Sequence, residues 1–413
     1  MEANPRQSGL PTQVSELPVL AENPGELPEN ERPWDRYARA KHDAPVFRFG
    51  GAVVVRNLEA IKAVLADRSF QQGARKAMEL MPGLDPRFVA RRKKSLLLRD
   101  GPDHLRMRRI ASKSSFSPKK SDRYRPMMQS IMERLTDGVP ADGACDAVSV
   151  LTHDYPTRVI IHVLGGAESD TEMFSALVET VLDAMTGVPA AVEEALVAHE
   201  QLDAFILDLI EEKRTSPGAD LITDLVQAET EEGTLSAEEV LNTAVSVITA
   251  GTDTTRNQLA IGLHLFADHP AQWEALADES SLEAAAHEIL RYSPLAHVLL
   301  RTSDENARVA GVDVPAGTML VLDIGGAQRD PAVYDDPNTF DLGRPEPVDH
   351  LGLGFGHKYC LGASLATAEI VEALRVLRRR FASIEHAGVT RWKRAGFVNG
   401  PLELPLRLTS PER

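Results

Sequence analysis

A glycine-rich segment that leads into one cysteine and then into a helix constrains this chain more than any other feature. Gly354 and Gly356 precede Cys360, Gly362 follows it, and a helical pattern begins at Ala363. Glycine lets the backbone adopt left-handed conformations and approach a large planar ligand closely. A cysteine just before a helix start lies near the positive end of the helix dipole, which favours the thiolate. The segment therefore fits one axial metal ligand but not a tetrahedral zinc site, because no other cysteine lies nearby; an inert buried cysteine in a tight turn is the alternative.

The composition excludes several classes of protein. The chain has 413 residues, of which 43% are hydrophobic and 26% charged, as in ordinary folded proteins. The net charge of -16 argues against bulk nucleic-acid binding, and two cysteines are too few for a disulfide-rich secreted fold. We find no apolar run of about 18 residues that would span a membrane and no apolar N-terminal signal segment. We therefore expect a cytoplasmic protein.

The pattern along the chain predicts one large, mainly α domain with a minor β part. Prolines recur through residues 1–33, which we interpret as an extended, poorly packed lead-in to a single domain over 34–413. Helical spacing of apolar residues dominates 58–66, 121–267 and 363–381. The other segments are predicted as a hairpin around Gly50–Gly51 (46–55), strands and turns (308–322, 389–408), an irregular connection (330–347) and a solvated acidic loop (229–232).

Two short motifs place polar residues on one helix face. Glu288 and Arg291 lie three apart and can pair, as many solvated residues do. His104 and Arg108 lie four apart, so together they can bind a carboxylate. Taken singly, each of these residues could also be an ordinary surface charge.

A third motif, Ala250-Gly-Thr-Asp-Thr-Thr255, lies inside a long apolar helix that begins with a capping box at Ser236–Glu239. Glycine, threonine and aspartate at this density disfavour a helix interior. We therefore expect a local distortion with a functional purpose. The alternative is that Asp253 and Thr254 bond only to the helix backbone.

The loop around Cys360 resembles the haem-binding signature of the cytochrome P450 family, in which a Phe-Gly-x-Gly-x-His/Arg-x-Cys-x-Gly segment supplies the proximal thiolate. Gly354, Gly356, Cys360 and Gly362 match the pattern. Leu353 and Lys358 depart from it, standing where the family usually has Phe and His or Arg. The other motifs occur in the order that the family requires. The resemblance thus spans most of the chain and implies the cytochrome P450 fold, with haem between a long distal helix and the cysteine loop.

The resemblance also implies a role for each motif. Thr254 would hold a water on the oxygen-binding side of the haem, and Asp253 would relay protons inward. The residues implied in binding haem b are Cys360 on the iron, Gly354 and Gly356 in its loop, and His104, Arg108, Arg301 and Lys358 on the propionates. A buried charge network that fixes the loop would comprise Glu288, Arg291 and Arg344.

The implied activity is monooxygenation, in which one atom of O2 enters the substrate and the other leaves as water. The sequence contains no flavin or iron–sulfur segment, so electrons would come from a separate ferredoxin-type partner. We expect a monomer. The basic face on which the partner would dock, unless these are ordinary solvated charges, comprises Arg106, Arg109, Lys113, Lys119, Lys120 and Lys358.

The substrate is expected to be a small or medium, largely apolar molecule, because the residues implied in the pocket are mostly aliphatic. They are Phe88, Val245, Thr249, Ala250, Leu295, His297, Val298, Phe397 and Val398. Basic residues between Arg87 and Lys94 could attract an anionic substrate or an acidic carrier protein, or form a solvated loop. Two other functions remain open. One is a haem protein that recruits a carrier protein without oxidising a substrate, although the presence of Asp253 and Thr254 argues against it. The other is a haem-free helical scaffold.

Overall fold

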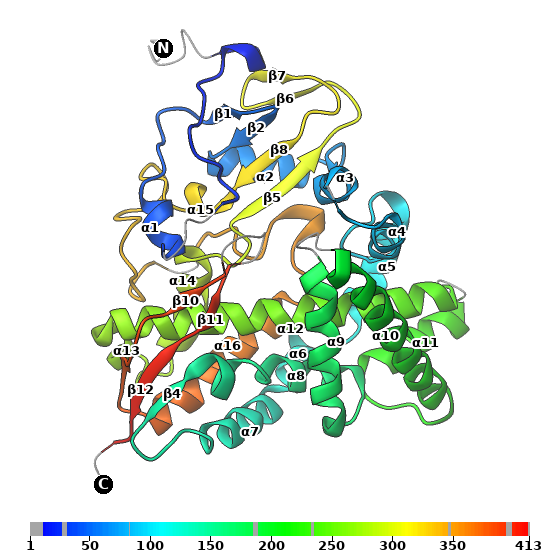
Figure 1. Ribbon diagram of the computed structural model, residues 1–413, viewed down its shortest axis with the longest axis vertical. Coiled ribbons are helices and arrows are strands. Elements are labelled where there is room, and N and C mark those ends of the chain that lie inside the picture. The colour runs from blue at the N-terminus through cyan, green and yellow to red at the C-terminus, as the bar shows by residue number, and fades with distance from the viewer. Residues whose placement is uncertain are drawn as a thin grey trace.

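The computed structural model, described for residues 11–26, 31–81, 83–184, 189–232, 235–345, 348–393 and 399–411, places a β-rich region above a larger helical region (Figure 1). The main sheet has the order β1-β2-β8-β5-β3, and its neighbouring strands are antiparallel except for the parallel pair β2 and β8. The strands are β1 (Val46–Phe49), β2 (Ala52–Val55), β3 (Gln71–Gln72), β5 (Val298–Thr302) and β8 (Leu320–Asp323). Short helices α1 (Pro33–Ala38), α2 (Leu58–Ala66), α3 (Gly73–Leu80) and α15 (Ile324–Ala327) belong to this region.

The predicted hairpin and the helix after it are confirmed. Phe49 pairs with Ala52 across the two-glycine turn, where Gly50 has a φ of 55° that favours glycine. Asn57 then caps α2, because its side chain accepts a hydrogen bond from the N–H of Ala60 at 3.0 Å. Local sequence signals therefore suffice to fix this part of the sheet.

The helical region is built around α12 (Ala237–Asp268), which crosses the molecule beneath the sheet (Figure 1). The helices that pack on it or nearby are α5 (Gly101–Lys113), α6 (Pro118–Asp122), α7 (Arg125–Thr136), α8 (Tyr155–Leu164), α9 (Thr171–Asp183), α10 (Pro189–Thr215), α11 (Leu221–Glu232), α13 (Pro270–Ala275), α14 (Ser281–Tyr292) and α16 (Ala363–Arg380). Helix α4 (Pro86–Lys93) packs against both α3 and α10 and so connects the two regions. The smaller strands are β4 (Ala144–Asp146), β6 (Ala307–Val309), β7 (Val312–Val314), β9 (Ser383–His386), β10 (Arg391–Trp392), β11 (Pro401–Glu403) and β12 (Pro405–Thr409).

Helix α12 begins as predicted but is not distorted. Ser236 and Glu239 form the expected capping box. The helix nevertheless continues unbroken through the Ala250–Thr255 motif. Hydroxyls in the motif, such as that of Thr252, donate to the carbonyl four residues back, at 3.1 Å. A Cβ at Gly251 would lie 3.1 Å from Cδ1 of Ile160 in α8, so this glycine permits close helix packing. The expected distortion was therefore wrong.

Two other predictions need correction. Part of the N-terminal stretch packs on the sheet: Leu17 is buried, and the N–H groups of Leu20 and Arg48 donate to the carbonyls of Arg48 and Pro18 at 2.8 and 2.9 Å. The stretch predicted to pack poorly thus adds apolar contacts to the sheet's core. The acidic stretch 229–232 is not a loop, since it forms the last turn of α11. Within the described ranges, we find no helix with the length and apolar character needed to cross a membrane.

Candidate active site

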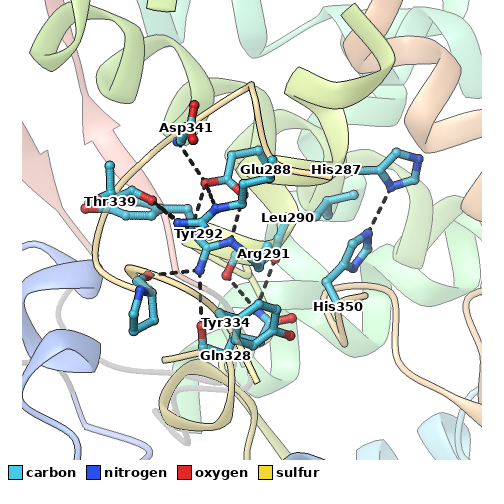
Figure 2. Close-up of polar contacts among 12 residues, drawn as sticks. His287, Glu288, Leu290, Arg291, Tyr292, Gln328, Tyr334, Thr339, Asp341 and His350 are labelled. Atoms are coloured by element: carbon cyan, nitrogen blue, oxygen red, sulfur yellow. Dashed lines mark hydrogen bonds and ion pairs between the residues drawn. The ribbon is translucent and has the colours of Figure 1, made fainter. Parts of the chain in front are cut away.

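A buried charge network forms around Glu288 and Arg291 in α14 (Figure 2). Nε and Nη2 of Arg291 donate to the two oxygens of Glu288 at 2.7 and 2.8 Å, and both side chains are almost wholly shielded from water. Nε of Arg344 also donates to Oε1 of Glu288, at 3.1 Å, so the structure brings together all three residues predicted for the network. We call Glu288, Arg291 and Arg344 the Glu288 network.

Gln328 connects the Glu288 network to the cysteine loop. Its Nε2 donates to the backbone carbonyl of Arg291 at 2.7 Å, and its Oε1 accepts from the N–H of Leu351 at 2.6 Å. The carbonyl of Leu351 in turn accepts from the N–H of Gly354 at 2.8 Å. No sequence pattern indicates Gln328, because a lone buried glutamine has no motif around it.

The cysteine loop is shaped by left-handed glycines, as predicted. Gly354 and Gly356 have φ values of 75° and 68°. A Cβ at Gly356 would lie 2.5 Å from the carbonyl oxygen of Leu65 in α2, so no larger residue fits. The N–H of Cys360 donates to the carbonyl of Leu353 at 2.8 Å, which closes the loop just before α16 begins at Ala363.

The Cys360 thiol lies in a mixed electrostatic environment. Burial raises its pKa, while a hydrogen bond from the N–H of Gly362 and the charge of Arg108 act in the opposite direction. Burial is the largest of these influences, so the pKa of the thiol is raised overall. A thiolate at this position needs a further cation, which a bound metal ion supplies.

Four side chains that we call the cation cluster surround one end of this loop: His104, Arg108, Arg301 and Lys358. Nζ of Lys358 lies 3.1 Å from Oδ1 of Asp100, and Nη2 of Arg108 donates to the carbonyl of Tyr359. Nη1 of Arg301 donates to the side chain of Gln72 at 2.6 Å and to the carbonyl of Leu300 at 2.8 Å. The charges of the cluster influence one another, since Lys358 and Arg108 lower the pKa of His104 and Arg301 lowers that of Lys358.

The cation cluster carries more positive than negative charge. Burial lowers the pKa of Arg108 and of Lys358, and lowers that of Arg301 to about 10. Burial also lowers the pKa of His104 to about 4. Asp100 is the one carboxylate seen to bind the cluster directly in the described part of the chain. A ligand that brings anionic groups, such as the two propionates of haem, fits this imbalance.

One face of α12 is open to solvent although the helix is otherwise buried along this stretch. Ala250 is exposed and Thr254, one turn later, is half-buried, whereas Thr249, Thr252 and Thr255 are buried. Ala250 and Thr254 are therefore the two positions of this face that are accessible from outside the helix packing.

The two side chains of the predicted acid–alcohol pair, Asp253 and Thr254, have different hydrogen-bond partners. Thr254 Oγ1 donates to the carbonyl of Ala250 at 2.6 Å, the backbone bond considered as the alternative. Asp253 instead lies 3.2 Å from Nζ of Lys393 and accepts from Nδ2 of Asn257 at 2.8 Å. Lys393 and Asn257 are polar neighbours of Asp253 that the sequence did not indicate.

Comparison with known proteins identifies the family of proteins in which these features occur. The family model described as Cytochrome P450 matches residues 47–393. The chain is 33% identical over 384 residues to the mycinamicin IV hydroxylase/epoxidase of Micromonospora griseorubida, covering 90% of this chain and 94% of the relative. It is 31% identical to the 6-deoxyerythronolide B hydroxylase of Saccharopolyspora erythraea, covering 91% and 96%.

The chain belongs to the cytochrome P450 family. Its fold agrees: the crystal structure of CalO2 matches with a TM-score of 0.86 and 25% identity over 95% of this chain and all of that one. P450BioI, solved in complex with a fatty acid-ligated acyl carrier protein, matches with a TM-score of 0.82 and 25% identity over 91% and 98%. The protein is accordingly a P450 monooxygenase, an enzyme that uses a haem with thiolate-bound iron and O2.

Most residues predicted for the P450 substrate pocket are buried in packing contacts rather than open. Phe88 is fully buried in an apolar cluster with Met78 and Leu98, and the fully buried His297 ring stacks 6.3 Å from that of Tyr37. Val245, Thr249, Leu295 and Val298 are buried as well, so Ala250 is the one exposed candidate within the described residues. Phe397 and Val398 lie outside the described residues.

The basic residues near α4 are mostly neutralised by neighbouring carboxylates. Arg87 pairs with Asp85 and Glu193 at 2.8 and 2.7 Å, and Lys94 pairs with Glu238 at 2.7 Å. Arg91 pairs with Asp203, and Lys93 pairs with Glu79. This pattern favours the interpretation of an ordinary charged surface over a site that attracts anions.

The predicted basic docking face is smaller than expected. Lys358 is almost completely buried beside Asp100, so it cannot take part. Arg106 pairs with Glu239, and Lys120 lies 2.9 Å from Asp224. Arg109, Lys113 and Lys119 remain exposed along α5 and α6.

Proposed function

We propose that this P450 hydroxylates a small or medium, largely apolar secondary metabolite with electrons from a separate ferredoxin. The observation that carries the proposal is the half-buried Cys360, held in a left-handed glycine loop beside a cation cluster that has too few anions of its own. The relatives named above act, by their names, on mycinamicin IV and 6-deoxyerythronolide B, which supports a secondary metabolite as the substrate. The free state of both cysteines supports a reducing, cytoplasmic location.

In this proposal, Cys360 binds the haem iron, and Arg108, Arg301, Lys358 and His104 hold the propionates. When bound, the haem supplies the oxygen chemistry, because thiolate ligation favours O–O cleavage. The Glu288 network and Gln328 keep the cysteine loop in place, so the position of the sulfur does not depend on the ligand alone.

Proton delivery is assigned to Asp253 and Thr254. Asp253 is bound to Lys393, which lies partly in solvent, so the carboxylate can exchange protons with water through this neighbour. The Thr254 hydroxyl donates to Ala250 and still has lone pairs that accept a hydrogen bond from a water on the open face of α12. Together the two side chains move protons from the surface toward that face.

The variant Thr254→Ala tests this assignment. We expect product formed per electron pair to fall and hydrogen peroxide to rise, while the spectrum of the enzyme stays unchanged, because the hydroxyl that orders the water is lost. Thr254→Ser keeps a hydroxyl and should restore coupling. Equal coupling in all three proteins would remove Thr254 from the proton path.

Turnover with a surrogate ferredoxin system separates the monooxygenase from a haem protein that only recruits a carrier protein. Candidate substrates are first selected by their ability to displace the iron-bound water, as seen in the absorption spectrum, and are then supplied free and linked to an acyl carrier protein. The complex of P450BioI favours testing the linked form. We expect turnover of the free form, because the cations near α4 are already paired and offer little attraction to an acidic carrier. Substrate binding without any product would overturn the proposal.

The exposed Arg109, Lys113 and Lys119 are proposed to dock the acidic ferredoxin. The double variant Arg109→Glu/Lys113→Glu should slow reduction by ferredoxin and weaken the dependence of that rate on salt. Reduction by dithionite, which needs no docking, is the control. A ferredoxin rate unchanged by the double variant would place the docking site elsewhere.

A further inference from the structure

Three potential metal ligands meet at the far end of α12, away from the open face of the helix. His264 and Asp268 are one turn apart at the C-terminal end of α12, and His386 ends β9. One ligand atom from each residue lies within 4.8 Å of the other two, and the part of the chain that the structure describes contains no second group of this kind. His264 is ten positions beyond Thr254, which corresponds to about 15 Å along the helix axis. The cluster is therefore separate from the candidate active site.

The distances between these side chains are close to those between ligands of one metal ion. Nε2 of His386 lies 2.9 Å from Oδ1 of Asp268, and Nε2 of His264 lies 3.6 Å from Oδ2 of the same carboxylate. The second distance is too long for a hydrogen bond. Ligands around a tetrahedral zinc ion, each about 2.0–2.2 Å from the metal, are separated by roughly this distance.

His264 is oriented as a metal-binding histidine would be. Its side chain is more than nine-tenths buried, and its Nε2 has no hydrogen-bond partner, although a buried nitrogen without a partner costs free energy. Its Nδ1 lies 3.1 Å from the hydroxyl of Thr390, which can fix the tautomer that leaves the Nε2 lone pair free.

The charges around the cluster also suit a cation. Nη1 of Arg32 lies 3.0 Å from Oδ2 of Asp268. By itself, the positive charge of Arg32 would repel a metal ion. However, Asp35 accepts two hydrogen bonds from the same guanidinium, at 2.7 and 3.0 Å. Arg32, Asp35 and Asp268 together therefore carry a net charge of about -1, and Oδ1 of Asp268 points to His386 rather than to Arg32.

We propose that His264, Asp268 and His386 form a binding site for one divalent transition-metal ion, with zinc as the best chemical match. Two imidazole nitrogens and one carboxylate oxygen are a common zinc ligand set, and water would complete the tetrahedron. Trp34 and Trp392 pack against the His264 ring, with centroids 5.1 and 5.2 Å away, and shield it from water. The ion would join the end of the central helix to β9 and so stabilise the fold. It would not contribute to the monooxygenase reaction.

Zinc binding to the haem-loaded enzyme, prepared without a histidine tag and first treated with a chelator, tests the proposal. After dialysis against zinc, elemental analysis should find one zinc in addition to one iron per chain. Competition with a chromogenic chelator should show that His386→Ala weakens zinc binding at least tenfold. His386 is partly exposed, so this variant is expected to fold. His162→Ala changes an exposed histidine elsewhere and should bind zinc as the parent does.

Two further measurements make the test sharper. Arg32→Gln removes the competing cation and should tighten zinc binding, and zinc should raise the melting temperature of the parent but not that of His386→Ala. The haem spectrum should be the same in every variant, which keeps this test independent of the proposed catalytic function. A parent that retains no zinc, or a His386→Ala variant that binds it as tightly, would overturn the proposal.

Discussion

Two groups of buried and half-buried cations in the described residues, the Glu288 network and the cation cluster, differ in how far protein carboxylates neutralise them. In the Glu288 network, Arg291 binds both oxygens of Glu288 and also donates to the carbonyls of Gln328, Pro337 and Thr339. In the cation cluster, Arg108 and Arg301 donate to neutral groups, and Asp100 serves Lys358. Buried charge is costly unless it is paired. The first group therefore acts within the fold, whereas the second is completed by an anionic ligand.

Removing Glu288, the centre of the Glu288 network, should have the largest effect on the free energy of unfolding. Glu288→Ala leaves Arg291 buried without a counter-ion, so we expect a loss of about 3–5 kcal/mol in the free energy of unfolding. Urea denaturation of parent and variant measures it. Glu283→Ala in the same helix is the matched control, because its ion pair with Arg125 is exposed and contributes about 1 kcal/mol or less. Equal losses in both variants would show that the Glu288 network has no special role.

In the cation cluster, removing a charge should weaken haem binding and leave the free energy of unfolding almost unchanged. Arg301→Gln removes a cation that lacks a protein carboxylate, so the unfolding free energy of the haem-free protein should hardly fall. Haem binding should weaken about 10- to 100-fold, as for the loss of a charged hydrogen bond. Transfer of haem to apomyoglobin reports the dissociation rate, with the exposed Arg308→Gln as control. If Arg301→Gln destabilised the haem-free fold as much as Glu288→Ala does, the contrast between the two groups would fail.

A change in pH should have a smaller effect on stability, through the protonation of His104. The pKa of His104 is about 4 in the folded chain, against 6.5 for an ordinary histidine, mainly because burial disfavours its charged form. The unfolded chain therefore binds more protons between pH 6.5 and 4, so His104 makes stability fall as the pH drops through that window. His104→Gln should flatten this part of the stability profile, measured by urea denaturation from pH 7 to 4. The exposed His162→Gln should leave the slope as it is; an unchanged slope in His104→Gln would contradict the assignment.

The sequence predicts local features well and long-range partners poorly. The hairpin over 46–55, α2 and α16 follow from short patterns of glycine, caps and apolar spacing, and the structure confirms them. The pairing of Asp253 with Lys393 joins residues 140 positions apart, and no local pattern marks it. Similarly, the sequence predicts Lys358 as part of a basic surface, whereas in the structure its side chain is buried beside Asp100.

The absorption spectrum of the reduced, carbon monoxide-bound protein tests the central claim most directly. If Cys360 supplies the thiolate, the parent should show the strongly red-shifted Soret band of a haem-thiolate protein, and Cys360→Ala should lose it while remaining folded by circular dichroism. Cys145→Ala should keep the band, because that cysteine lies in β4. A well-folded parent without this band, or a Cys360→Ala variant that retains it, would contradict the account.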